Sequence, residues 1–297
     1  MNNKSKIIRA ITADGSARIV FTDSTEIVKI GSEKHSTSKT MTAVLGRTLT
    51  VTSLMGSLLK NSTDSLTLRI NGDGPSGTVI CVSDYKGNVR GYAEHPNAEL
   101  PPNSYGKLDV GGAIGSGTLY VIRDLGMNEP YVGASPIVSG EIAEDITEYY
   151  AKSEQTPTVC ALGVRVGQDN ICYAAGGYLL QLMPGAEYDT AEKLESNVKL
   201  MRPVSQLIAD GVSGEEIIAS VFSGFEFEMF DEFDTEYLCT CSREKYLDAL
   251  AGLSRDDVRE LISKGEPIET QCCFCGEKYV FTPDEVSAEI KRKEKNK

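Results

Sequence analysis

The 297-residue sequence contains no tryptophan and only two histidines, His35 and His95, which stand far apart. A serine-histidine-aspartate triad needs a histidine beside a nucleophile and a carboxylate, and no such combination is recognisable. No pair of carboxylates stands out as an acid–base couple either. We therefore do not expect an enzyme.

Long apolar runs are also missing. The best candidate, residues 43–59, is interrupted by Arg47, and no run reaches the roughly 18 residues that a membrane-spanning helix needs. The first ten residues carry charge but no apolar core of the length found in signal peptides. These absences predict a cytoplasmic protein without a membrane partner, in a compartment where thiols are normally reduced.

Basic residues are scarce, with 30 lysines and arginines against 43 acidic residues and a net charge of −13. This balance argues against nucleic acid as a partner, because phosphate contacts need clustered cations. The deficit is local: residues 203–242 contain no lysine or arginine, nine acids and five of the eight phenylalanines. Those five are Phe222, Phe225, Phe227, Phe230 and Phe233.

Cysteine, by contrast, is abundant. Three of the eight, Cys81, Cys160 and Cys172, lie far apart in apolar, strand-like segments and are predicted to be unreactive core thiols. The other five fall within 37 residues near the C-terminus. Such clustering in a reducing compartment favours a metal site over a disulfide framework.

The clustered cysteines form two closely spaced groups, Cys239-Thr-Cys241 and Cys272-Cys273-Phe-Cys275, separated by thirty residues. Two such pairs without a nearby histidine are typical of a tetrahedral thiolate site, and zinc is the ion that such sites favour. Cys239, Cys241, Cys272 and Cys275 are the predicted ligands of one zinc ion. Gly276 permits a tight turn, and Cys273 is a surplus thiol predicted to point away from the ion. On this pattern alone, a permanent and unreactive structural zinc site is an alternative to a reactive one.

Hydrophobic periodicity predicts an α+β fold without regular alternation of strands and helices. Three regions are expected: a mixed sheet and helix body at 1–183, a helical acidic linker at 184–236 and a small zinc-binding module at 237–297. Asp14-Gly15 predicts a hairpin, and Ser242 and Ser254 are predicted N-caps in the module. Strands are predicted at 65–70, 78–83, 118–123, 158–166, 171–183 and in a hairpin at 269–281. Helices are predicted at 38–59, 188–201 and 204–222, the last with a break at Gly211 and Gly214. The tail at 291–297 is predicted to be disordered.

This composition also suggests a switch. A module of about sixty residues has a small core, so loss of a structural metal is expected to unfold it. Thiolates are the reactive form of cysteine, and oxidation of closely spaced pairs would expel the ion. The linker phenylalanines are expected to be covered by the body until then. Afterwards the nine acids, which are expected to have no counter-charge, would keep the released chain extended and soluble. An amphipathic, solvated helix is the simpler interpretation of the same segment.

The residues resemble a known family, the redox-regulated 33-kDa heat-shock chaperonin, which is a holdase. The resemblance lies in Cys239-Thr-Cys241-Ser-Arg-Glu and in Cys272-x-Phe-Cys275-Gly-Glu-Lys-Tyr. It extends in the same order over nearly the whole chain, through segments 72–75, 89–92, 125–131, 139–145, 153–157 and 176–181. Cys273 departs from the family pattern, which usually has another residue there, and it offers an alternative ligand or disulfide partner.

The resemblance implies an ATP-independent chaperone that is inactive while its four cysteines hold zinc. On oxidation, Cys239 would pair with Cys241 and Cys272 with Cys275, zinc would leave, and the module and linker would unfold. The active form would bind unfolding client proteins and form a homodimer. A thiol–disulfide oxidoreductase and a zinc-ribbon nucleic-acid binder are the alternative functions, although no βαβ pattern precedes Cys272 as the first would require.

Overall fold

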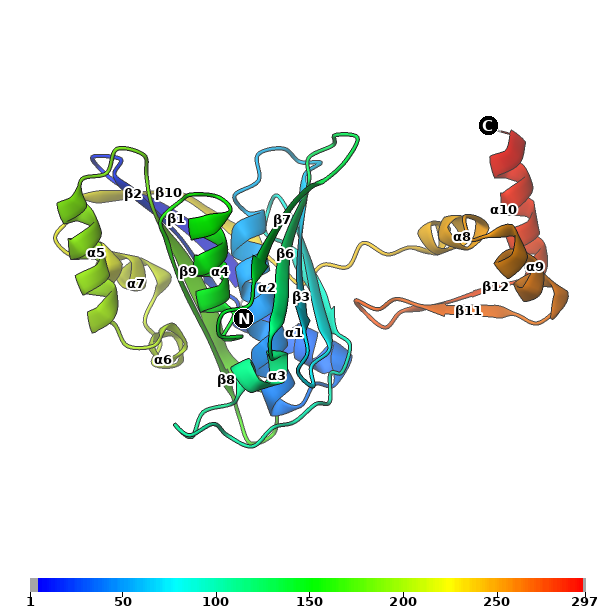
Figure 1. The fold of residues 1–297 in the computed structure, drawn as a ribbon, viewed down its shortest axis with the longest axis horizontal. Helices are drawn as coiled ribbons and strands as arrows, with labels where there is room; N and C mark the ends of the chain where they lie inside the picture. The colour runs from blue at the N-terminus through cyan, green and yellow to red at the C-terminus, as the bar shows by residue number, and fades with distance from the viewer. Residues whose placement is uncertain (1–4, 296–297) are drawn as a thin grey trace. The chain divides into compact units, whose positions relative to one another are not determined.

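The computed structural model describes residues 5–295 and confirms the α+β class (Figure 1). The chain forms two compact units, Met1–Leu238 and Cys239–Lys297. Residues 184–236, predicted to be a separate linker, belong to the first compact unit. The functional division at residue 184 therefore remains a prediction.

The first sheet has five antiparallel strands in the order β10-β1-β2-β9-β8. Strands β1 and β2 form the hairpin predicted at Asp14-Gly15, where Gly15 adopts a φ of 71° that favours glycine. The strands are β1 (Ser5–Thr12), β2 (Ala17–Asp23), β8 (Thr158–Val166), β9 (Cys172–Leu182) and β10 (Phe227–Thr235).

The second sheet is also antiparallel, in the order β5-β4-β3-β6-β7. Three of its strands were predicted, whereas the two outer strands β5 and β7 were not. The strands are β3 (Ser65–Gly72), β4 (Thr78–Asp84), β5 (Val89–Ala93), β6 (Gly117–Asp124) and β7 (Tyr131–Pro136). The accompanying helices of this unit are α1 (Thr25–His35), α2 (Lys39–Gly56), α3 (Val110–Ile114) and α4 (Ala143–Lys152).

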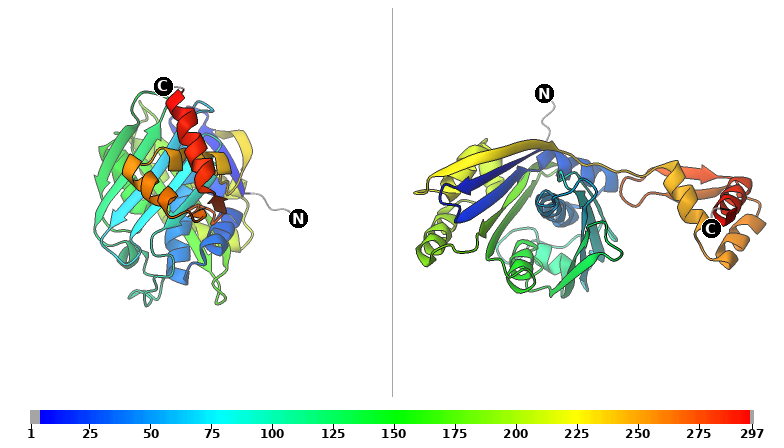
Figure 2. Two further views of the ribbon diagram at one scale, coloured as in Figure 1. Left: turned by 90° about the vertical axis from the view of Figure 1, so that its right-hand side faces the viewer. Right: turned by 90° about the horizontal axis from the view of Figure 1, so that it is seen from above.

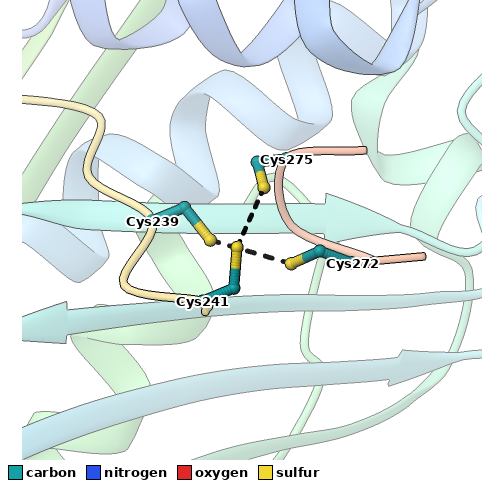
Figure 3. A group of neighbouring side chains, drawn as sticks. All are labelled: Cys239, Cys241, Cys272 and Cys275. Atoms are coloured by element: carbon teal, nitrogen blue, oxygen red, sulfur yellow. Dashed lines mark hydrogen bonds between the residues drawn. The ribbon is translucent and has the colours of Figure 1, made fainter. Parts of the chain in front are cut away.

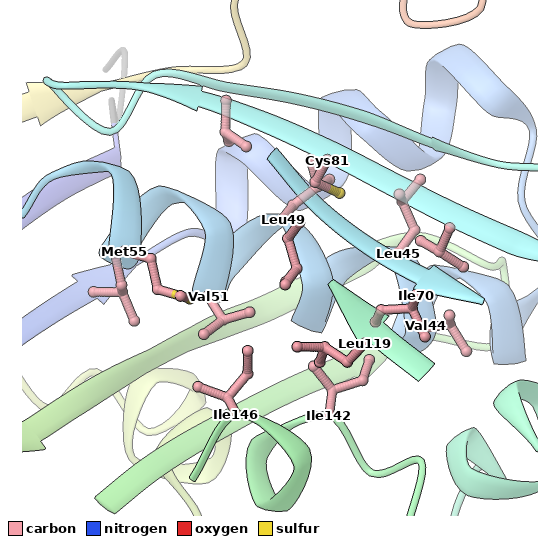
Figure 4. Packing of buried hydrophobic residues seen from close by; sticks show 14 of the residues in the cluster. Val44, Leu45, Leu49, Val51, Met55, Ile70, Cys81, Leu119, Ile142 and Ile146 are labelled. Atoms are coloured by element: carbon pink, nitrogen blue, oxygen red, sulfur yellow. The ribbon is translucent and has the colours of Figure 1, made fainter. Parts of the chain in front are cut away.

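Helix α2 lies between the two sheets and is buried on almost every side (Figure 2, right). Its apolar residues, among them Leu45 and Leu49, join residues of both sheets and of α4 in the main hydrophobic core (Figure 4). The buried hydroxyls of Thr48, Thr50 and Thr52 donate to backbone carbonyls one turn earlier at 2.7–2.8 Å. This local bonding satisfies the threonine side chains in an interior where an unpaired hydroxyl would be destabilising.

The other face of the first sheet is covered by α5 (Tyr188–Leu200), α6 (Val204–Ala209) and α7 (Gly214–Val221). The sequence predicts α5 closely, and the second predicted helix is divided into α6 and α7 near Gly211. Ser213 caps α7 and forms a capping box with Glu216. A second hydrophobic core fills the space between these helices and the sheet.

The end of the predicted helical linker is instead the edge strand β10, which pairs with β1 from Phe227 to Thr235. The description of the linker as helical therefore does not hold for residues 227–235. The alternation of acidic and aromatic residues fits a strand with one solvated face.

The expectation that the linker acids lack counter-charges is also wrong for part of the segment. Lys6 and Arg9 on β1 form ion pairs with Glu232 and Asp231 on β10. The counter-charges come from a strand more than 200 residues away in sequence, which a local window cannot reveal.

The last residues of the first unit are bonded to the β4–β5 hairpin of the same unit. The Leu238 amide donates to the Val89 carbonyl at 2.9 Å, and the Val89 amide donates to the Glu236 carbonyl at 3.0 Å. Between them, the buried Tyr237 hydroxyl donates to the Gly91 carbonyl at 3.0 Å. The chain is therefore anchored in the core directly before Cys239.

The second unit contains α8 (Arg243–Ala251), α9 (Arg255–Ser263), the hairpin of β11 (Ile268–Gln271) and β12 (Lys278–Phe281), and α10 (Pro283–Lys295). The side chains of Ser242 and Ser254 cap α8 and α9 as predicted. The predicted disordered tail is wrong for residues 291–295, which belong to α10, whereas 296–297 lie outside the described residues. No helix among residues 5–295 is long and apolar enough to cross a membrane.

Candidate metal centre

The four predicted ligands, Cys239, Cys241, Cys272 and Cys275, converge in the second unit (Figure 3). All four sulfur atoms lie within 4.8 Å of one another. The Sγ atoms of Cys239 and Cys272 are 3.7 Å apart, and those of Cys241 and Cys275 are 3.4 Å apart. All four are free thiols. The two sequence groups thus form one cluster with its sulfurs pointing to a common centre.

Each group of cysteines is positioned by the element beside it. Cys239 and Cys241 lie on the segment that leads into α8, directly before its cap Ser242. Cys272 and Cys275 lie in the turn between β11 and β12, where the Gly276 amide donates to the Cys272 carbonyl at 2.9 Å. Gly276 has a φ of 76°, so the turn needs the glycine that follows the second pair.

Backbone amides of the same turn face the sulfur atoms. Burial alone would raise the pKa of the Cys272 thiol, but hydrogen bonds from the Tyr246 hydroxyl and from the amides of Phe274 and Cys275 outweigh it and lower the pKa to about 6. Burial and the neighbouring thiols raise the pKa of Cys275, although the Glu277 amide also donates to its sulfur. The turn thus supplies donors that stabilise sulfur anions.

A divalent cation fits this arrangement. Four thiolates about 4 Å apart would repel one another by on the order of 4 kcal/mol per pair at an effective dielectric constant of 20. A tetrahedral zinc ion with bonds of about 2.3 Å places its sulfurs about 3.8 Å apart. The observed separations of 3.4 and 3.7 Å are close to that value. The four cysteines can therefore hold a metal ion.

Two tyrosines that the sequence reasoning did not single out complete the surroundings of the sulfurs. The Tyr279 hydroxyl lies 3.1 Å from Cys241 Sγ, and the Tyr246 hydroxyl donates to the carbonyl of Gln271, directly before Cys272, at 3.5 Å. Their rings pack on each other with centroids 5.1 Å apart. Tyr279 appears in the motif after Cys275, but only the fold brings Tyr246 to the cluster.

The remaining cysteines lie outside the cluster. Cys273 is exposed, whereas its neighbour Cys272 is only 3% exposed. Cys81, Cys160 and Cys172 are buried in the first unit, as the sequence predicts. Burial raises the pKa of all three thiols, that of Cys172 to about 12, which keeps them protonated and unreactive.

The five linker phenylalanines have different surroundings. Phe222 is fully buried and packs against Phe227 with ring centroids 5.4 Å apart. Phe225 and Phe233 are partly buried and lie against the cations of Lys193 and Arg9. Phe230 is 55% exposed, so the expectation that the body covers the phenylalanines does not extend to this side chain.

Comparison with known proteins gives consistent results over the whole chain. The family model described as Hsp33 protein matches residues 5–282. A 33 kDa chaperonin of Clostridium acetobutylicum is 44% identical over 294 residues, which cover 98% of this chain and 99% of that protein. A 33 kDa chaperonin of Staphylococcus aureus is 41% identical over 282 residues, covering 95% and 96% of the two chains.

A solved structure is similar in fold. The crystal structure of the 33 kDa chaperonin (heat shock protein 33 homolog) from Thermotoga maritima matches with a TM-score of 0.89 and 34% sequence identity. The match covers 99% of this chain and 100% of that one. Both compact units therefore have counterparts in that structure.

Proposed function

The chain belongs to the Hsp33 family of 33 kDa chaperonins, and from this premise we propose that it is a zinc-locked holdase activated by oxidation. The observation that carries the proposal is the cluster of four cysteine sulfurs within 4.8 Å of one another. We propose a non-enzymatic role in the cytoplasm, with unfolding proteins as partners and no nucleic acid.

In the reduced protein, Cys239, Cys241, Cys272 and Cys275 would hold one zinc ion. The ion supplies positive charge that allows four thiolates to share one centre. The amides of the β11–β12 turn orient and stabilise the sulfurs of the second pair. Because these ligands come from the segment before α8 and from the β11–β12 turn, the centre would hold that helix and the hairpin together.

Oxidation would convert the four thiolates into two disulfides, Cys239–Cys241 and Cys272–Cys275. Each disulfide forms by loss of two electrons from a pair of thiolates. One molecule of peroxide takes up two electrons and two protons and becomes two molecules of water, so both pairs consume two peroxides. Sulfurs committed to disulfides no longer serve as thiolate ligands, and the module loses its main source of stability.

Unfolding of the module would then release the adjoining segment of α5–α7 and β10. This segment contains buried Phe222 and covers one face of the first sheet. Its release would expose apolar surface for client binding, while its acids keep the exposed chain soluble. We propose that the oxidised form also assembles as a homodimer.

The test follows zinc release and client aggregation together. Zinc-loaded protein is treated with peroxide at mild heat in the presence of a thermally unfolding client protein, without ATP. We expect stoichiometric zinc release followed by suppression of light scattering. The zinc-loaded, reduced protein serves as the inactive control, and reduction with added zinc should reverse the activation.

Release of zinc without suppression of aggregation would contradict the chaperone function. Turnover in the reduction of insulin would favour a thiol–disulfide oxidoreductase instead. Tight, salt-dependent binding of RNA by the zinc-loaded protein would favour a zinc-ribbon nucleic-acid binder.

A further inference from the structure

Arg243 makes three different contacts at one place in the second unit. This arginine is the first residue of α8 and lies two positions after Cys241. Its Nη2 donates to the Val280 carbonyl at 3.1 Å and to Glu285 Oε1 at 2.8 Å. Its guanidinium also lies over the Phe281 ring, 4.6 Å from the ring centroid. All three partners lie where β12 ends and α10 begins.

The partners of Arg243 are themselves held in place. Phe281 is fully buried and belongs to the small core of the second unit. The other carboxylate oxygen of Glu285, Oε2, accepts from the Thr282 amide at 2.8 Å and from its hydroxyl at 3.2 Å. The Glu285 amide donates back to Thr282 Oγ1 at 3.3 Å, which is the reciprocal pattern of a capping box. Arg243 therefore contacts a junction whose geometry is already fixed.

This junction directly follows the hairpin that carries the second cysteine pair. That pair lies in the turn between β11 and β12, and β12 ends at Phe281. The first pair lies on the segment that leads into α8. Arg243 therefore connects the element after the first pair to the two elements after the second pair. The connection runs through a backbone carbonyl, a carboxylate and an aromatic ring.

The combination of contacts suits arginine in particular. A planar guanidinium can donate hydrogen bonds in its plane while its face lies over an aromatic ring. The ion pair alone would contribute little, because the side chains of Arg243 and Glu285 are 44% and 40% exposed. The carbonyl and the ring add two contacts to it. The compact ammonium of a lysine keeps the charge but cannot make all three contacts.

A zinc site depends on the relative position of its ligand pairs, because the ion needs four sulfurs around one centre. Here the pairs are separated by thirty residues, so their placement depends on how α8 packs against β12 and α10. We propose that Arg243 is a positioning residue that holds the first cysteine pair in place relative to the second. This inference rests on the proposed function and names a residue outside the four ligands. Weaker placement would let the centre lose zinc more readily, so Arg243 helps to maintain the reduced, inactive state.

The test uses the full chain under reducing conditions, with Zn²⁺ affinity measured by competition with a chromogenic chelator. We expect Arg243→Gln to bind Zn²⁺ about tenfold more weakly, the equivalent of one hydrogen bond to a charged group, because metal binding and folding of the module are coupled. Arg243→Lys, which keeps the charge, should recover part of the loss. Arg292→Gln is the matched control, because Arg292 is 69% exposed and pairs with Glu289 within α10.

Cobalt spectroscopy separates positioning from a general loss of stability. At saturating Co²⁺ every variant carries metal, and the ligand-field bands of the ion report how its four ligands are arranged. We expect Arg243→Gln to change these bands and Arg243→Lys to lie closer to the wild type. Glu285→Gln completes a double-mutant cycle for the ion pair. The loss of Zn²⁺ affinity in the double variant should be smaller than the sum of the two single losses.

Wild-type Zn²⁺ affinity and an unchanged cobalt spectrum in Arg243→Gln would overturn the inference. Weaker affinity with an unchanged cobalt spectrum would also overturn it, since Arg243 would then contribute to stability alone. If Arg243→Gln fails to fold, Arg243→Lys and Glu285→Gln decide the question, and wild-type values in both would contradict the inference. A wild-type protein that binds neither Zn²⁺ nor Co²⁺ would instead contradict the proposed metal centre, so the two failures are distinguishable.

Discussion

At the scale of single residues, position in the turn decides what a cysteine can do. Cys272 and Cys273 are adjacent and chemically identical, yet one is buried among the converging sulfurs and the other faces solvent. The amides of Phe274 and Cys275 turn toward Cys272. Two neighbouring thiols therefore provide a matched pair for testing the ligand set.

We predict that Cys272→Ser abolishes stoichiometric zinc binding, whereas Cys273→Ser leaves it intact. A serine hydroxyl is a much poorer zinc ligand than a thiolate, and Cys273 lies outside the cluster. Elemental analysis of the purified variants measures the bound metal. Full zinc content in Cys272→Ser, or its loss in Cys273→Ser, would require a different ligand set.

The clustering of the four candidate ligands could be predicted from the sequence because their signal is local. Cys239, Cys241, Cys272 and Cys275 fall into two closely spaced groups, as a tetrahedral thiolate site would require, and Gly276 marks the turn. Tyr246 carries no such signal, since a tyrosine on an amphipathic helix usually packs in a core. Its position beside Cys272 depends on how α8 meets the hairpin, which spacing alone does not specify.

At the scale of elements, the segment with α5–α7 and β10 combines helices that form from local patterns with a strand that depends on a partner distant in sequence. Its helices were predicted because their apolar periodicity is contained within each helix. Strand β10 was not, because its pairing partner is β1 at the opposite end of the chain. The ion pairs of Glu232 and Asp231 depend on the same distant strand.

Substitutions at Phe222 and Phe230 test how much the packing of this segment contributes to the free energy of unfolding. We predict that Phe222→Ala lowers the free energy of unfolding of the first unit by about 3–5 kcal/mol, because it leaves a cavity in a closed core. Phe230→Ala, at an exposed side chain, should change it by no more than about 0.5 kcal/mol. Urea unfolding of the reduced protein measures both values. Similar losses in the two variants would contradict the observed difference in burial.

At the scale of the whole molecule, the two units differ in what stabilises them. The first has an extensive core around α2 and a second core beneath α5–α7. The second has one small core that includes Leu250, Ile268 and Phe281. A unit of that size usually needs a metal or disulfides for independent stability.

We therefore predict that a strong zinc chelator, under reducing conditions, unfolds the second unit and leaves the core around α2 folded. Hydrogen exchange should show loss of protection throughout α8, α9 and β11–β12, with protection retained in α2 and β3. The same sample with zinc restored is the control. Simultaneous loss of protection in both units would mean that they unfold as one cooperative body.

The anchor at Tyr237 has a mechanical consequence. Its buried ring and its hydrogen bond to Gly91 lie between Cys239 and strand β10 along the chain. A force applied to the chain at the first cysteine pair would have to pull this ring out of the core before it could separate β10 from β1. We therefore expect β10 to remain paired with β1 for as long as the Tyr237 ring stays in the core.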